Sequence, residues 1–135
     1  MTFPIDEKFI VEFESELGLQ LPVDYKNGLL CSNGGEVVTS SDVWQLFPVF
    51  DKSNRKRVTR TANHILVETK SANEWGGFPC TAVAIASNGV GDLAILVPEQ
   101  ENAGQLKDIV YRWHHETGDV TILCPTSEIW FNSLA

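Results

Sequence analysis

Residues 81–97 have the sequence TAVAIASNGVGDLAILV, in which two apolar runs flank a short polar stretch. The first run, Thr81 to Ser87, and the second, Asp92 to Val97, have the length and composition of strands. Between them, Asn88-Gly89-Val90-Gly91 contains the residue types that a tight turn prefers. This stretch therefore predicts two neighbouring strands joined by a turn.

Further strands are predicted on both sides of this pair. Val43 to Phe50 is apolar and aromatic and predicts a strand, with Pro48 near its end or on a sheet edge. Ile109 to His114 and Val120 to Leu123 predict a hairpin whose connection is residues 115–119.

Helical patterns precede, interrupt and follow the strands. Apolar residues at every fourth position predict an N-terminal helix: Ile5, Phe9, Phe13 and Leu17. A second helix is predicted to start at Pro22 and to end at Ser32-Asn33-Gly34-Gly35. Residues 54–73 predict a middle helix whose buried side includes Val58 and Ala62, and a short last helix follows a cap at Thr126 or Ser127. Helices that bracket a strand-rich half indicate the α+β class.

Length and composition indicate one domain over residues 1–135, because domains commonly have about 100–150 residues. Neither an internal repeat nor a linker is evident. The longest uncharged apolar stretch, Thr81 to Ala86, is far shorter than the roughly 20 residues that cross a bilayer. The first residues lack the basic and apolar segments of a signal peptide. We therefore expect a cytoplasmic protein that does not bind membranes.

The net charge of −8 at neutral pH is unevenly distributed. Residues 1–52 and 71–135 are both acidic, whereas residues 53–70 are basic. The basic segment is compatible with a nucleic-acid patch, but the solvated face of a helix is the favoured interpretation. An acidic surface repels phosphates and attracts basic proteins. A basic protein is therefore the expected partner, and nucleic acid is not.

Residues that could hold a metal or react are sparse. Cys31, Cys80 and Cys124 form no Cys-x-x-Cys pair, and their apolar neighbours predict small buried hydrophobic residues. His114 and His115 are adjacent, so their side chains are expected on opposite faces of a strand. We expect no metal and no cofactor.

Catalytic motifs are equally weak. Gly89-Val90-Gly91 lies between two predicted strands, whereas a phosphate loop requires a helix N-terminus or an equivalent cluster of N–H groups. Ser87 is not in a Gly-x-Ser-x-Gly sequence. Asp92 and Asp119 could act as paired carboxylates only if their two turns meet in space. We therefore predict no enzyme activity.

The tryptophans divide into two groups. Trp44, Trp113 and Trp130 lie in patterned elements and are predicted to be core residues, whereas Trp75 lies in the irregular stretch Glu74-Trp75-Gly76-Gly77. A Trp in a loop either folds back on the core or is exposed and anchors a partner. Both interpretations remain open for Trp75.

The order of these features resembles the SUKH superfamily, the group of Smi/Knr-type proteins. The opening sequence IVEFESELGLQLPVDY at 10–25, which continues to LLCSNGG at 29–35, is similar to the start of that family. IASNGVGDL at 85–93 is similar to its strand–turn–strand signature, HHETGDV at 114–120 to its late hairpin, and residues 126–134 to its closing helix. The resemblance covers nearly the whole chain in the right order, although each motif alone is weak.

The resemblance implies one α+β domain in which N-terminal helices pack on a largely antiparallel sheet, with a middle helix and a short C-terminal helix. It also implies a non-catalytic protein that binds other proteins. Bacterial relatives are immunity proteins that neutralise a cognate toxin, often a nuclease or deaminase. Fungal relatives are regulatory scaffolds of cell-wall synthesis and signalling, which leaves a regulatory adaptor as the alternative. The absence of a long extension favours the bacterial form.

The resemblance does not locate the partner surface. We expect acidic and aromatic residues near predicted turns to form it, and six candidates stand out: Glu36, Asp42, Trp44, Glu74, Trp75 and Asp92. Their order in the sequence does not establish that they form one patch.

Overall fold

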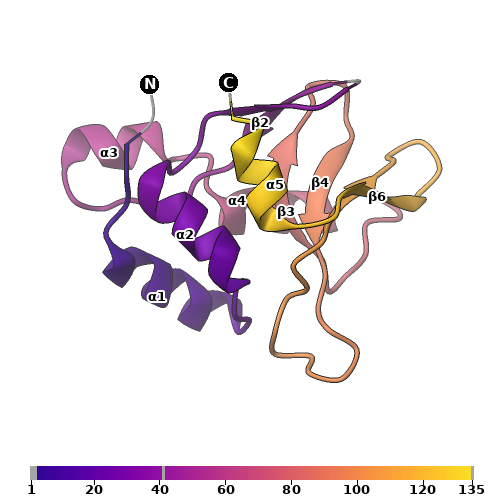
Figure 1. Ribbon diagram of the computed structural model, residues 1–135, viewed down its shortest axis with the longest axis horizontal. Helices are drawn as coiled ribbons and strands as arrows, with labels where there is room; N and C mark the ends of the chain where they lie inside the picture. The colour runs from indigo at the N-terminus through magenta and orange to yellow at the C-terminus, as the bar shows by residue number, and fades with distance from the viewer. Residues whose placement is uncertain (1–2, 41, 135) are drawn as a thin grey trace.

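The computed structural model describes residues 3–40 and 42–134, and within them helices pack against an antiparallel sheet (Figure 1). The strands lie side by side in chain order: β1 (Glu36–Val38), β2 (Val43–Leu46), β3 (Val83–Ser87), β4 (Leu93–Leu96), β5 (Val110–Trp113) and β6 (Val120–Cys124). All neighbouring strands run antiparallel. The helices are α1 (Glu7–Leu17), α2 (Val23–Cys31), α3 (Arg55–Arg60), α4 (Ile65–Asn73) and α5 (Ser127–Asn132). The predicted α+β class is confirmed.

Local signals in the sequence position the terminal helices. The Asp6 carboxylate accepts a hydrogen bond from the Lys8 backbone N–H, so it caps the start of α1. Gly18 ends α1 with a φ of 77°, a left-handed conformation that glycine adopts without steric cost. The Thr126 hydroxyl accepts from the Ile129 N–H at 3.2 Å and caps α5. The predicted end of the first helix at Gly18 and the predicted cap of the last helix at Thr126 are therefore confirmed, whereas Ile5, predicted in the first helix, precedes α1.

One buried apolar cluster joins the helices to the sheet. Trp44, Trp113 and Trp130 are at most 1% exposed, which confirms their prediction as core residues. The Trp44 ring on β2 packs on Trp130 of α5, with ring centres 6.5 Å apart. Tyr25 of α2 meets Phe131 of α5 edge to face at 4.9 Å. These aromatic pairs fix α5 between the sheet and α2.

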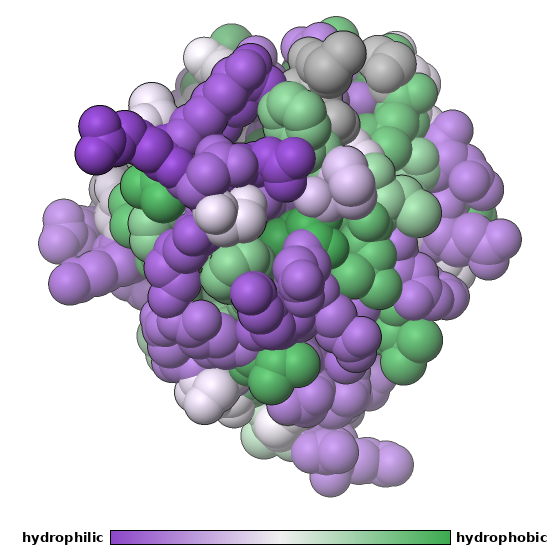
Figure 2. All heavy atoms as spheres, turned by 90° about the vertical axis from the view of Figure 1, so that its left-hand side faces the viewer, coloured by the Kyte–Doolittle hydropathy of each residue, from purple (hydrophilic) through white to green (hydrophobic). Residues whose placement is uncertain are grey.

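The helices α1, α2 and α3 group on one side of the strands (Figure 1). Figure 2 shows this side, where hydrophilic side chains cover most of the surface and hydrophobic atoms are visible only in smaller areas between them. This outer surface of the helices is consistent with their amphipathic sequence pattern.

The predicted middle helix over 54–73 is wrong in one respect, because the structure has two helices there, α3 and α4. The chain turns between them, where the Thr61 hydroxyl donates to the Arg57 carbonyl and accepts from the Asp51 N–H at 2.9 Å. Thr61 is thereby tied to a segment outside the helix. As a result Val58 and Ala62, predicted on the buried side, are exposed.

The predicted strand over 43–50 ends at Leu46, before Pro48. Beyond it, the Asn33 side chain donates to the Val49 carbonyl and accepts from the Val49 N–H, both at 2.8 Å. Val49 therefore satisfies its backbone groups with Asn33 instead of a neighbouring strand. The three-residue strand β1 was not predicted, since so short a stretch carries no clear period.

Two of the three cysteines differ from the prediction. Cys124 is buried, but Cys31 and Cys80 are exposed. Cys31 occupies the last turn of α2 and Cys80 lies in the loop before β3, so their apolar sequence neighbours did not determine their burial. In the part of the chain that the structure describes, no helix has the length and apolar character needed to cross a membrane.

Candidate functional site

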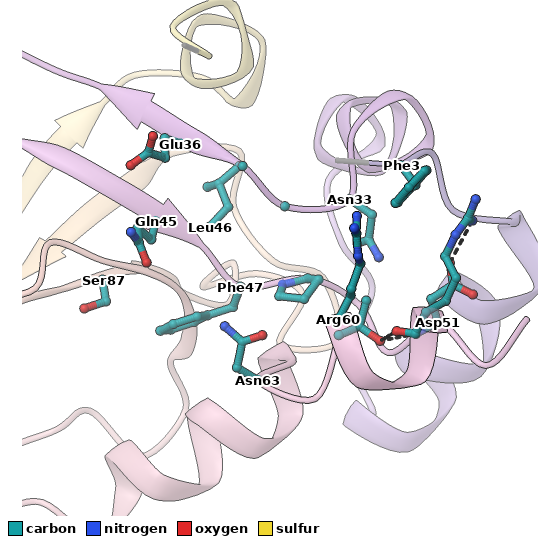
Figure 3. Close-up of a pocket in the computed structure, with 15 residues that line it drawn as sticks. Phe3, Asn33, Glu36, Gln45, Leu46, Phe47, Asp51, Arg60, Asn63 and Ser87 are labelled. Atoms are coloured by element: carbon teal, nitrogen blue, oxygen red, sulfur yellow. Dashed lines mark hydrogen bonds and ion pairs between the residues drawn. The ribbon is translucent and has the colours of Figure 1, made fainter. Parts of the chain in front are cut away.

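A groove of about 600 Å³ lies between the sheet and α3 (Figure 3). One wall of the groove is formed by residues of three neighbouring strands, because Glu36 on β1 pairs with Gln45 on β2 and Gln45 pairs with Ser87 on β3. Residues that are partners across strands share one face of a sheet. These polar side chains therefore form a row on the face opposite the buried Trp44.

The helix wall of the groove is basic and aromatic. The guanidinium groups of Arg57 and Arg60 lie 4.2 and 5.0 Å from the centre of the Phe3 ring. Arg57 also pairs with the buried Asp51 at 3.3 Å. Burial raises the pKa of Asp51, but hydrogen bonds from Ser53 and Arg57 outweigh it and leave this pKa below its ordinary value.

The groove offers both charges to a ligand. Arg57 is engaged by Asp51, whereas Arg60 is exposed and forms no ion pair with a described residue. Glu36 lies on the opposite wall and is also exposed (Figure 3). Amide and hydroxyl groups of Gln45 and Ser87 complete a lining suited to the polar groups of a protein segment.

A second polar cluster, the Arg112 network, comprises Asp42, Trp44, Asp92, Arg112 and His115. Arg112 of β5 places Nε and Nη2 at 2.9 and 2.7 Å from Asp92 Oδ2, just before β4. Its Nη1 lies 2.8 Å from Asp42 Oδ2, just before β2, and its guanidinium lies 5.4 Å from the centre of the Trp44 ring. The network therefore fastens the starts of two strands to a third.

Asp92 is 7% exposed and uses both carboxylate oxygens. Its Oδ1 accepts hydrogen bonds from the backbone N–H of His115, at 3.1 Å, and from the His115 ring. Burial raises the pKa of Asp92, but the hydrogen bonds from His115 and Arg112 outweigh this effect and bring the pKa down to about 2. Asp92 is therefore a fixed anion that joins the β3–β4 turn to the β5–β6 connection.

The two turns that carry Asp92 and Asp119 do meet in space, since both residues line one pocket of about 500 Å³. Asp92 nevertheless stays ionised near neutral pH and its oxygens are already hydrogen-bonded. A group with so low a pKa is a poor general acid or base at neutral pH. The geometry gives no support to a carboxylate pair that transfers protons.

The expectation that His114 and His115 point in opposite directions is wrong. Their Nδ1 atoms both approach the Asp92 carboxylate, that of His114 at 3.8 Å. The strand β5 ends at Trp113, so the alternation of a strand does not extend to these residues. Among residues 3–40 and 42–134, no group of three or more His, Cys, Asp or Glu is arranged to hold a metal ion.

The six predicted partner residues occupy three places. Glu36 lies in the groove; Asp42, Trp44 and Asp92 belong to the Arg112 network; Glu74 and Trp75 follow α4. Trp44 is fully buried and Asp92 nearly so, whereas Trp75 is 45% exposed. Partner contact stays a prediction for all six, and Trp44 and Asp92 present almost no surface for it.

Asn88 connects two of these places. It lines a shallow hollow together with Glu36, and its Nδ2 donates to Asp42 Oδ1 at 3.4 Å. The prediction from sequence missed Arg112 and Arg60, which organise the network and the groove. The role of Arg112 follows from the strand register and that of Arg60 from the position of α3, and no local sequence motif predicts either.

The family model described as SMI1 / KNR4 family (SUKH-1) matches residues 4–133 of the chain. No curated protein and no solved structure gives a significant match.

Proposed function

The chain belongs to the SMI1 / KNR4 family (SUKH-1), and from this membership we propose that it is a cytoplasmic immunity protein that binds and neutralises a basic toxin domain. The observation that carries the proposal is the match over residues 4–133, nearly the full chain. Members of this family bind other proteins without catalysis, and its bacterial members include toxin inhibitors. A nuclease or a deaminase is the class of toxin that fits an acidic inhibitor best.

The charge distribution supports this proposal. The chain carries −8 at neutral pH, and many carboxylates lie on the surface: Glu7, Glu16, Glu36, Glu74, Glu99, Glu101, Glu116, Asp119 and Glu128. Enzymes that act on nucleic acids present basic clefts to phosphates. An acidic protein approaches such a cleft at an electrostatically increased rate and competes with the substrate for it.

The proposed contacts use the exposed members of the predicted set. Glu36 projects into the groove, and Glu74 and Trp75 lie on the surface after α4. Asp42, Trp44 and Asp92 contribute indirectly, because the Arg112 network connects the starts of β2 and β4 to β5.

The test is binding of the purified protein to the toxin domain encoded beside its gene, at low and high salt. We expect selective binding that weakens as salt rises, together with loss of the toxin's activity. Glu36→Gln and Glu74→Gln should weaken the complex, while Glu99→Gln serves as a control of equal charge change. Equal binding to an unrelated basic protein would contradict the proposal, and selective retention of a housekeeping protein instead would favour a regulatory adaptor.

A further inference from the structure

The two edge strands of the sheet differ in whether another segment pairs with their outer side. On the β1 edge, the Val38 N–H donates to the Ser133 carbonyl at 3.0 Å, and Val37 pairs with Leu134. The segment after α5 therefore covers β1. The strand β6 forms the other edge, and no described segment pairs with its outer side. In Figure 1 this edge lies on the far side of the molecule from α1, α2 and α3.

Apolar side chains are exposed on the hairpin that ends at this edge. Trp113 pairs with Val120, and Tyr111 pairs with Ile122, so these four residues share one face of the sheet. Trp113 is buried there, but Val120 is 41% exposed and Ile122 is 66% exposed. Trp75, which is 45% exposed, lies beside them, since its ring centre is 6.0 Å from that of Trp113.

We name Trp75, Tyr111, Val120 and Ile122 the hairpin patch. Soluble proteins seldom leave neighbouring large apolar residues exposed without a use for them. The sequence of β6, Val-Thr-Ile-Leu-Cys, contains no charged residue and no proline, which commonly protect edge strands. Its register shifts at Leu123, so the regular part of the open edge is Val120 to Ile122.

The rim of the hairpin patch is acidic. Glu74 precedes Trp75 in the chain, and Glu116 and Asp119 lie in the connection that leads into β6; all three are exposed. The Gly77 carbonyl lies close to Gly118, so the loop after α4 borders this connection. An apolar centre that contains aromatic residues, with a charged rim, is the usual anatomy of a protein interface.

We propose that the hairpin patch, with the open edge of β6, is the docking surface for the basic partner protein. The proposal rests on the proposed function and adds where the partner binds. Apolar side chains of the partner would cover Val120, Ile122 and Trp75, and its Lys or Arg side chains would face the acidic rim. A second copy of this chain fits less well, because each copy carries −8.

The test compares two pairs of Val or Ile to Thr substitutions that leave charge unchanged. Val120→Thr with Ile122→Thr alters the hairpin patch, whereas Val11→Thr with Val23→Thr alters two exposed valines, 59% and 68%, on α1 and α2, the helices on the far side of the molecule from β6. We expect the first pair to weaken binding of the toxin domain about tenfold or more and Trp75→Ala to weaken it similarly, with the control pair within about threefold.

The outcomes separate this inference from the proposed function. If the toxin domain binds and the patch variants retain full affinity, the docking surface is wrong while the function stands. If the toxin domain does not bind, the function fails, and a synthetic peptide of alternating valine and lysine then tests the patch alone. Shifts of the amide resonances of residues 120–122 would support the patch; their absence would overturn it. If the protein self-associates and the Val120→Thr and Ile122→Thr substitutions abolish this self-association, the patch binds a second copy, and the choice of a basic partner is overturned.

Discussion

Arg112 binds Asp92 through two nitrogen atoms that converge on one carboxylate oxygen, Nε at 2.9 Å and Nη2 at 2.7 Å. The third nitrogen, Nη1, is left to reach Asp42. A buried carboxylate is tolerated only when charged donors satisfy it, and charge-assisted bonds from a guanidinium are among the strongest available. The pair is therefore a structural device that connects β5 to the turn before β4.

Removal of the guanidinium should destabilise the fold strongly. Arg112→Met keeps much of the side-chain volume but leaves Asp92 buried without its counter-charge, so we expect a loss of about 3 kcal/mol in the free energy of unfolding. Urea denaturation at neutral pH measures this loss. Arg55→Met, at an exposed position of α3, is the control and should change stability by less than about 1 kcal/mol. Equal stability of the two variants would contradict the structural role of Arg112.

Acid should weaken the fold through Asp92. Burial alone would raise its pKa, but His115 and Arg112 lower it to about 2, below the ordinary 3.8. A lowered pKa stabilises the folded state above the unfolded pKa, and this stabilisation, about 2 kcal/mol, is lost as the pH falls from about 4 towards 2. Urea denaturation across this range should show the loss in the native protein. Asp92→Asn should lack that part of the pH dependence, and an unchanged acid dependence in this variant would refute the assignment.

Gly28, in the middle of α2, is predicted to tolerate alanine poorly. Alanine normally stabilises a helix relative to glycine by about 1 kcal/mol. At Gly28, however, an added Cβ would overlap the ring of Phe131 on α5. We expect Gly28→Ala to destabilise the fold by about 1–3 kcal/mol in thermal or urea unfolding. Adding Phe131→Leu should reduce that penalty, and a simple sum of the two single effects would show that the contact is not the cause.

The thiols should react at two different rates. Cys31 and Cys80 are exposed, whereas Cys124 is buried and its pKa is raised by that burial. A thiol-specific reagent should therefore modify Cys31 and Cys80 quickly in the native protein, and Cys124 only when the protein opens. Mass spectrometry of labelled peptides identifies each site. Cys124→Ala should remove the slow phase alone; fast labelling of Cys124 would contradict its burial.

The elements that could be predicted from sequence are those whose cause is local. The turn at 88–91, the helix end at Gly18 and the cap at Thr126 each act within a few residues, and the structure confirms the elements that they delimit. The break between α3 and α4 was not predictable in this way. It depends on a hydrogen bond from the Asp51 N–H to Thr61, ten residues away, and helical periodicity carries no signal of that partner.

The candidate sites depended even more on distant contacts. Asp42 and Asp92 were selected from the sequence as acidic residues near turns, but Arg112, which lies 70 and 20 residues from them, was not. Trp44 was predicted both as a core residue and as a partner candidate, and β2 turns it towards α5, which confirms only the first prediction. The direction of a side chain follows from register, and register is set by pairing across the whole sheet.

The order in which the strands pair affects how the chain can fold during synthesis. Each strand lies beside the one that follows it in the sequence, and the pairs β1–β2, β3–β4 and β5–β6 are joined by connections short enough to form hairpins as soon as their residues leave the ribosome. The β1 edge is different, because its cover is supplied by Ser133 and Leu134, about a hundred residues later. A nascent chain therefore carries an uncovered edge and an incomplete core until α5 is made, which is the interval in which chaperone contact or aggregation is most probable.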